Sequence, residues 1–255
     1  MGMGFYHGRG DWGYRRVLNY LLLDALILLF PLILSFRWRF RYYKFFPPLF
    51  GAIAIVGTAY IVWDVFVTAE GHWAFNDDFL AGVRLMGLPI EEILFFVVVP
   101  YSCIFIFENL EHFLPDRRRP VDRRWPLVPA ALFLVGAAVF HAQQYTMAAL
   151  ASCGIFLVLS AFFDPGLLGS RNFWAYIGLS MIPFVMFNFL LTSLPVVTYN
   201  PEAIWGGDGW WNGRFLTIPL EDFFYNYSLL SLYLLAYLML KRRFPAGDKS
   251  APAGR

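Results

Sequence analysis

Residues 89–107 read PIEEILFFVVVPYSCIFIF. This is an apolar span of about twenty residues, the length that crosses the hydrocarbon core of a bilayer as a helix. Proline suits the first turn of a helix, where its missing N–H costs nothing, and acids in that turn complement the helix dipole. The stretch therefore predicts a membrane helix that opens on Pro89, Glu91 and Glu92.

The chain repeats this pattern. Residues 217–225 read TIPLEDFFY, so that Pro219, Glu221 and Asp222 open a second long apolar span, 130 residues after the first motif. Upstream, a second set of matches lies 124 residues apart: Asp64, Thr68, Phe75 and Asn76 against Asn188, Thr192, Tyr199 and Asn200. A six-residue length difference in the connection explains the change of offset. The sequence thus predicts an internal repeat, which has to be settled before any other assignment.

The composition is that of an integral membrane protein. Hydrophobic residues make up 59% of the 255 residues and charged residues 15%, whereas a soluble domain carries about 25% charged residues. The formal net charge of +2 gives no reason to expect nucleic acid as a partner. Both cysteines, Cys103 and Cys153, lie inside apolar runs and form no CxxC pattern, so we expect neither a disulfide framework nor a metal site.

Apolar spans predict an all-α integral membrane fold with seven transmembrane helices. We expect them at about 17–35, 47–67, 89–110, 126–142, 145–163, 174–194 and 219–240. Basic runs at 37–44, 117–124 and 241–243 fall on one side of the membrane if the amino terminus is outside. The positive-inside rule then predicts a multi-pass protein of the cell membrane with a cytoplasmic carboxyl terminus.

The repeat divides the chain into units of three helices. We expect a polar tail (1–16), a first unit with helices one to three (17–114), a basic loop with the linking helix four (115–144), a second unit with helices five to seven (145–243) and a disordered tail (244–255). Helix four lets both units insert in the same direction. This predicts a pseudo-twofold axis along the membrane normal, with a cleft between the halves.

The acidic motifs carry the predicted chemistry. A carboxyl group near a membrane core is costly as an ion, so it can stay neutral and donate a proton, while a second carboxylate takes one back. Glu92 shares a helix face with Phe95 and Phe96, and Asp222 shares one with Tyr225 and Asn226. Aromatic faces beside acids can stabilise a carbocation. These are the parts that a cationic polyene cyclisation needs.

The repeated motifs resemble the lycopene cyclase domain family. The resemblance runs from DVFVTAEGHWAFN through GLPIEEILFF in the first half and from NFLLTSLPVVTYNPEAI through TIPLEDFFYNY in the second. It covers about residues 15–243, in the layout of the fused form of the heterodimeric carotenoid cyclases. It implies a lycopene β-cyclase, an intramolecular lyase or isomerase that converts the ψ end groups of lycopene to β-ionone rings in carotenoid biosynthesis, giving β-carotene by way of γ-carotene.

The resemblance also implies the site and the partners. Glu91, Glu92, Glu221 and Asp222 match its acidic motifs. Of these, Glu91, Glu92 and Glu221 are expected to be the acid–base set, and Asp222, Asp64 and Asn188 are expected to support or position them. No flavin, nicotinamide or metal is expected, since no GxGxxG follows a strand. The implied partners are lycopene and other acyclic carotenes, membrane lipid and other carotenoid enzymes. Which acid donates the proton, and whether the halves build one site or two, stays open at this point.

Other interpretations also fit parts of the pattern. The acidic pairs could simply cap helices at the membrane interface, and Asp24, which has no acidic counterpart in helix five, could make a structural hydrogen bond. Arg84 and Arg214 could pair with the motif acids or face water. Intramembrane acids and repeats also occur in transporters, and a non-catalytic carotenoid-binding protein would need the aromatic residues but not the acids.

Overall fold

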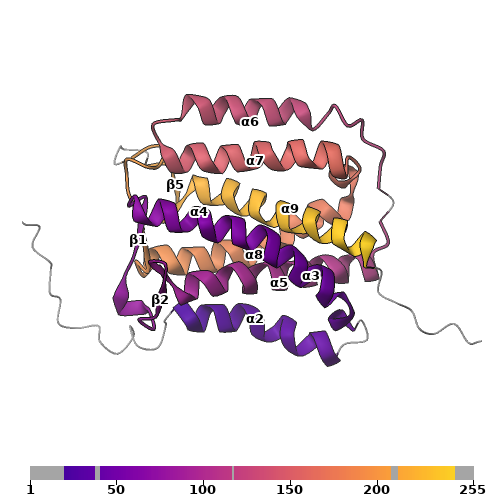
Figure 1. Ribbon diagram of the computed structural model, residues 1–255, viewed down its shortest axis with the longest axis horizontal. Helices are drawn as coiled ribbons and strands as arrows, with labels where there is room; N and C mark the ends of the chain where they lie inside the picture. Colours follow the sequence, from indigo (N-terminus) through magenta and orange to yellow (C-terminus); the bar gives the residue numbers. More distant parts are fainter. Residues whose placement is uncertain (1–19, 38–40, 117, 208–211, 245–255) are drawn as a thin grey trace, which may run out of the picture.

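The computed structural model describes residues 20–37, 41–116, 118–207 and 212–244. The predicted amino-terminal tail, 1–16, lies outside these ranges, as does all but the first residue of the predicted carboxyl-terminal tail, 244–255. The described chain is mostly helical, and its long helices lie roughly side by side in one bundle (Figure 1).

Helices occur where apolar runs predict them. They are α2 (Tyr20–Arg37), α3 (Phe46–Ala52) continuing through the π-helical turn η2 (Ile53–Gly57) into α4 (Thr58–Ala69), α5 (Ile90–Phe113), α6 (Leu127–Val139), α7 (Gln144–Phe163), α8 (Arg171–Ser193) and α9 (Leu220–Arg243). Short 3-10 turns lie at η1 (Tyr42–Phe45), η3 (Asp77–Phe79) and η4 (Leu167–Gly169). Five helical segments are long and apolar enough to cross a membrane: 42–69, 90–113, 144–163, 171–193 and 220–243.

The connections differ from the plain polar loops expected, because they contain short strands at one end of the bundle (Figure 1). β1 (Trp73–Phe75) pairs with β4 (Val197–Tyr199), β2 (Arg84–Leu85) with β3 (Leu88–Pro89), and β5 (Arg214–Phe215) with β6 (Ile218–Pro219), all antiparallel. We call this end of the bundle, residues 70–89, 194–207 and 212–219, the strand end.

The prolines of the two motifs also differ from the expectation. Pro89 and Pro219 are the N-cap residues of α5 and α9 rather than members of the first turn, with ψ angles of 146° and 143°. Each pairs across a hairpin with an arginine, Arg84 or Arg214. Each hairpin thus ends at the residue before its helix begins. It therefore fixes the direction in which the helix starts, and with it the positions of the motif acids in the first turn.

The repeat offsets recur in the backbone hydrogen bonds. Ala74 pairs with Thr198, its own counterpart at an offset of 124, so β1 and β4 pair around equivalent residues. The N–H of Asn76 donates to Val196 and that of Asn200 to His72, at 2.9 and 2.8 Å. Each connection thus donates to the other from an equivalent residue, Asn76 or Asn200, and accepts at an equivalent residue, His72 or Val196.

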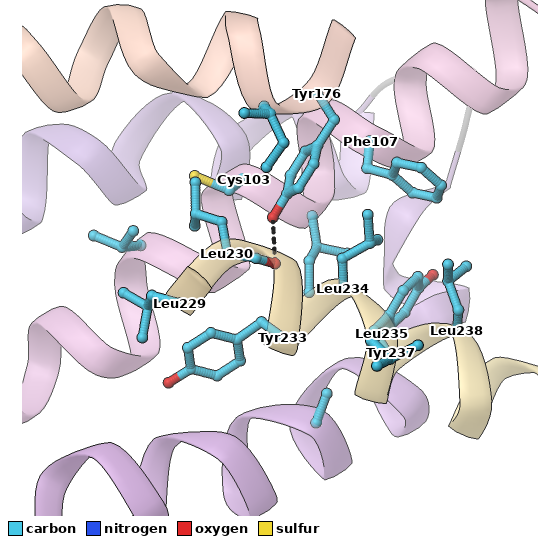
Figure 2. Close-up of a cluster of buried hydrophobic side chains, with 14 of the residues drawn as sticks. Cys103, Phe107, Tyr176, Leu229, Leu230, Tyr233, Leu234, Leu235, Tyr237 and Leu238 are labelled. Carbon is cyan, nitrogen blue, oxygen red and sulfur yellow. Dashed lines mark hydrogen bonds between the residues drawn. The ribbon is translucent and has the colours of Figure 1, made fainter. Parts of the chain in front are cut away.

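Helix α9 lies at the centre of the packing. It contacts α3 and α7, while α5 contacts α2 and α8, and α6 packs on the outside against α7 (Figure 1). Figure 2 shows the buried side chains along α9, with Leu229, Leu234 and Leu238 among them. The Tyr176 hydroxyl of α8 donates to the Leu230 carbonyl at 3.1 Å, which is the dashed line in that view. This core fixes α5 and α9 relative to each other, and therefore also fixes the positions of the acidic motifs in their first turns.

Candidate active site

A cavity of about 540 Å³ lies among α2, α5, α8 and α9, and both acidic motifs contribute one carboxyl group to its wall. These are Glu92 of α5 and Asp222 of α9. On α5 the lining residues run from Glu92 to Ile106, which at 1.5 Å per residue is about 21 Å of helix. The cavity is therefore an elongated apolar groove with carboxyl groups near the strand end.

The groove reaches the outer surface of the bundle. Its lining residues Leu26 and Phe30 on α2 are 49% and 67% exposed, and Met186 on α8 is 53% exposed. All three belong to apolar helices, so their exposed surface would face acyl chains in a bilayer. An apolar molecule could enter this groove sideways from the lipid.

Asp222 accepts three hydrogen bonds from three different elements. The Tyr145 hydroxyl of α7 donates to Oδ1 at 2.5 Å, and the Asn188 amide of α8 and the Tyr199 hydroxyl of β4 donate to Oδ2 at 2.8 Å each. Asp222 is only 3% exposed. Burial, and after it the charge of Asp222, raises the pKa of Tyr199 well above its ordinary value, so this hydroxyl remains a donor.

Glu92 has different surroundings. It accepts one hydrogen bond, from the Tyr20 hydroxyl of α2 at 2.8 Å, and it interacts electrostatically with the carboxyl group of Asp64 on α4. Asp64 is buried, and its Oδ1 accepts from Thr68 at 3.0 Å and from the Trp73 indole at 3.1 Å. In the first half, the cavity acid Glu92 therefore lies beside a second carboxyl group, that of Asp64. At the equivalent place in the second half, Asp222 lies beside the Asn188 amide.

The two acids correspond, and so do their partners. Tyr20 and Tyr145 lie in the first turns of α2 and α7, 125 residues apart, and each donates to the cavity acid of its own half. Tyr199 has no such match, because its counterpart, Phe75, lacks a hydroxyl group. Sequence reasoning missed the roles of the three tyrosines, although aligning α2 with α7 would have paired Tyr20 with Tyr145.

Glu91 and Glu221 point away from the cavity. Glu91 Oε1 accepts the Ala81 N–H at 2.6 Å, and Glu221 Oε1 accepts the Trp205 N–H at 2.7 Å and the Thr146 hydroxyl at 2.5 Å. Ala81 and Trp205 are 124 residues apart, so the same anchor recurs in both halves. Each motif thus uses its first acid to hold a connection and presents its second acid to the cavity.

The other predicted residues divide in the same way. Phe95, Tyr225, Asn226 and Asn188 line the cavity, whereas Phe96 and Asp64 are buried behind its wall. Phe96 stacks with Tyr60, at 6.2 Å between ring centroids. Among the described residues, no three His, Cys, Asp or Glu side chains are grouped as metal ligands would be.

Neither hairpin arginine pairs with a motif acid in the described structure. Arg84 donates to Asp77 at 2.6 Å and to the Gly87 carbonyl at 3.0 Å, and Arg214 donates to the Thr217 carbonyl at 2.7 Å. Gly87 and Thr217 are again 130 residues apart. The arginines therefore close the two hairpins.

A family model described as Lycopene cyclase matches residues 18–110 and 142–240, which is most of the chain and includes both acidic motifs. The chain belongs to the lycopene cyclase family.

The curated relatives are fungal proteins. Bifunctional lycopene cyclase/phytoene synthase of Arthroderma gypseum is 29% identical over 158 residues, 60% of this chain and 25% of the relative. The protein of the same name from Phaeosphaeria nodorum is 29% identical over 117 residues, 43% of this chain and 20% of the relative. The match thus spans at most about a quarter of these relatives' length. No solved structure matches the chain significantly.

Proposed function

We propose that this membrane protein is a lycopene β-cyclase that works by acid–base catalysis alone. The observation that carries the proposal is that two carboxyl groups, Glu92 and Asp222, line one apolar groove and have different hydrogen-bond partners. The family match supports a cyclase, and the fungal relatives' name includes lycopene cyclase. The groove fits a long, linear, apolar substrate such as lycopene or another acyclic carotene.

The surroundings of the two acids favour one assignment of roles. Three donors stabilise the ionised form of Asp222, which suits a base. Glu92 lies beside the carboxyl group of Asp64, and two neighbouring carboxyl groups cannot both ionise easily, which suits a proton donor. This is the general pattern in which two carboxyl groups acquire opposite roles from their environments.

The reaction then balances without a cofactor. Glu92 gives a proton to C2, and the C1=C2 electron pair forms the new C–H bond and leaves a cation at C1. The C5=C6 pair closes the C1–C6 bond and moves the cation to C5. Asp222 removes the proton from C6, and the pair that is left restores C5=C6 in the β ring. Phe95 and Tyr225 line the groove beside these acids, where their rings can stabilise the cation.

One groove with one acid and one base implies one ring closure at a time. A substrate with two ψ ends would be released, reversed and bound again, so γ-carotene would precede β-carotene. We therefore favour one shared site over one site in each half. Asp64 and Asn188 act here as positioning residues, and Glu91 and Glu221 hold the connections over the site.

The architecture that we propose has seven membrane spans in two units. The units are 17–114, with α2 to α5, and 145–243, with α7 to α9, joined by residues 115–144 with α6. Its support is the recurrence of packing: α2 on α5 matches α7 on α9, and α3 on α9 matches α8 on α5. The pseudo-twofold axis then passes between β1 and β4. The basic residues after α2 and α5 and in the last turn of α9 favour an inner side opposite the strand end.

The name of the fungal relatives joins lycopene cyclase with phytoene synthase. It supports the proposal that this chain, too, works beside other carotenoid enzymes, from which it would receive its acyclic substrate within the membrane.

The test is to express the chain in lycopene-making cells grown with and without heavy water. We expect β-carotene and γ-carotene with deuterium on the new ring, and none from Glu92→Gln. Glu111→Gln is the matched control: it lies on the same helix, away from the cavity, and the glutamine keeps the acceptor for the Asn172 amide at 2.8 Å. Unchanged lycopene with folded wild-type protein would refute the proposal.

A further inference from the structure

The two halves differ in how many carboxyl groups they place at or near the cavity. The first half places four there, and the second half places two. The first set is the buried Asp24, Asp64 and Glu91 with the half-buried Glu92, and the second is the buried pair Glu221 and Asp222. The counterparts of Asp24 and Asp64 are Ala149 and Asn188, at offsets of 125 and 124. Two acids have thus no acidic counterpart, and Asp24 is the one that the proposed reaction leaves without a role.

Asp24 is buried without the hydrogen bond that was expected of it. The residue is 2% exposed, and neither of its carboxyl oxygens has a hydrogen-bond partner in the structure. None of the ion pairs found among the described residues includes Asp24. An ionised carboxylate in such a place would cost several kcal/mol. The same group costs far less when it holds a proton.

The position of Asp24 connects it with the proposed proton donor. Asp24 lies one turn after Tyr20 on α2, so the two side chains share a face of that helix. The Tyr20 hydroxyl donates to Glu92 Oε2 at 2.8 Å. Behind the wall, Asp24 interacts electrostatically with Glu91, whose Oε2 is also buried without a partner. Asp24 and Glu91 are therefore two buried carboxyl groups that repel each other when both are ionised, which favours a proton on one of them.

A proton store answers a need that the reaction creates. Substrate and product are isomers, so each ring closure leaves Glu92 without its proton and Asp222 with one more. Glu92 must be reprotonated before the next turnover. The groove is then filled by an apolar product, which keeps water from Glu92 on the cavity side.

We propose that Asp24 is the proton reserve of Glu92. This inference rests on the proposed function and deepens it. After ring closure, the Tyr20 hydroxyl gives its proton to the Glu92 carboxylate and takes the proton of Asp24 in exchange. Water at the strand end then refills the reserve, since Glu91 lies directly beneath the exposed connection at Ala81. Asp222 releases its proton separately, so the reserve gains and loses one proton in each cycle.

The experiment compares the first turnover with later turnovers. The full-length chain is reconstituted in phosphatidylcholine vesicles loaded with lycopene, and cyclic carotenes are quantified by chromatography after rapid quenching. The variants are Asp24→Asn, which has no proton to give, and Asp24→Glu, which restores the carboxyl group. Glu111→Gln controls for the loss of an acid elsewhere in the bundle.

We expect Asp24→Asn to keep the first turnover within about twofold of the wild type, because Glu92 starts protonated. Its steady-state rate should fall about 100-fold, the lower end of what a positioned proton donor contributes. Asp24→Glu should recover most of that rate. An equal fall in both phases, or no fall in either, would overturn the inference, whereas an inactive wild-type chain would refute the proposed function itself.

A second measurement does not depend on turnover or on the folding of one variant. Infrared spectra of the wild-type protein should contain the C=O stretch of a protonated carboxyl group that is absent from Asp24→Asn and shifted in Asp24→Glu. If the wild-type and both variant spectra agree in this region, Asp24 carries no proton and the inference is wrong.

Discussion

The neighbouring acids of the second half, Glu221 and Asp222, should respond oppositely when each is changed to its amide. Asp222→Asn removes the proposed base from the cavity wall. Glu221→Gln keeps the oxygen that accepts from Thr146 and Trp205, at 2.5 and 2.7 Å. The first change should therefore lower turnover, and the second should mainly lower stability.

The magnitudes follow from these contacts. A positioned base contributes about 10²–10⁴-fold to a rate, or about 2.7–5.4 kcal/mol at 1.36 kcal/mol per tenfold. Asp222→Asn should lose that much in kcat. Glu221→Gln puts an amide N–H₂ where Oε2 is buried without a partner, and an unsatisfied buried donor costs about 1–3 kcal/mol of stability. Its kcat per folded molecule should stay within about tenfold of the wild type.

The assay uses purified full-length protein in lipid vesicles with lycopene, with thermal unfolding followed on the same samples. Chromatography should also show a change of product with Asp222→Asn, because a ring cation that lacks its base loses a proton from another carbon. Loss from C4, for example, gives an ε ring. The assignment would be refuted if Glu221→Gln were the slower enzyme, or if Asp222→Asn made β-carotene at the wild-type rate.

Three further changes test other parts of the structure. Glu92→Gln should abolish deuterium uptake from heavy water into any cyclic product, which mass spectrometry measures; labelled rings from this variant would exclude Glu92 as the donor. Ile27→Trp places a larger side chain in the wall of the groove, and this overpacking should slow the turnover of lycopene about tenfold. The turnover of a shorter polyene should slow less. Equal slowing of both substrates would argue against the groove as the polyene site. Burial alone would raise the pKa of Asp116, but hydrogen bonds from Ser170 and Asn172 and the nearby Arg171 charge hold it below its ordinary value. The ionised Asp116 therefore stabilises the folded protein fully above the unfolded pKa of about 3.9, and this stabilisation is lost as the pH falls through the lower pKa of the folded state. In acid unfolding, the Asp116→Asn variant should lack this pH-dependent loss of stability. Identical acid transitions of the wild type and the variant would contradict the prediction.

The helices and the repeat could be predicted because both depend on local properties of the chain. The apolar run after Pro89 has only one way to satisfy its backbone in lipid, which is a helix. The offset of 124 is visible in the residues and returns in the hydrogen bonds of Asn76 and Asn200, and the offset of 130 returns in those of Arg84 and Arg214. The strands could not be predicted in this way, since β1 and β4 are three residues long and form only because the two connections meet.

The site could be predicted only in part. The sequence named both acids of each motif and first favoured Glu91, Glu92 and Glu221 as the acid–base set. Adjacent residues on a helix point about 100° apart, so one acid of each pair had to face elsewhere, but the pattern does not say which. Phe95 and Phe96 divide for the same reason, one on the cavity wall and one in the core.

From the order of its residues alone, the sequence predicted long apolar helices of membrane character, where those helices lie and which family the chain belongs to. Hydrophobic length and internal similarity are properties of the chain read in order, so no tertiary contact is needed to establish them. Only the tertiary structure decided that Glu92 and Asp222 share one groove, that three donors from α7, α8 and β4 meet on Asp222, and that Asp24 is buried without a partner. Each of these depends on side chains brought together from distant segments. Because a carboxyl group's protonation is set by such neighbours, two matching motifs can take opposite roles.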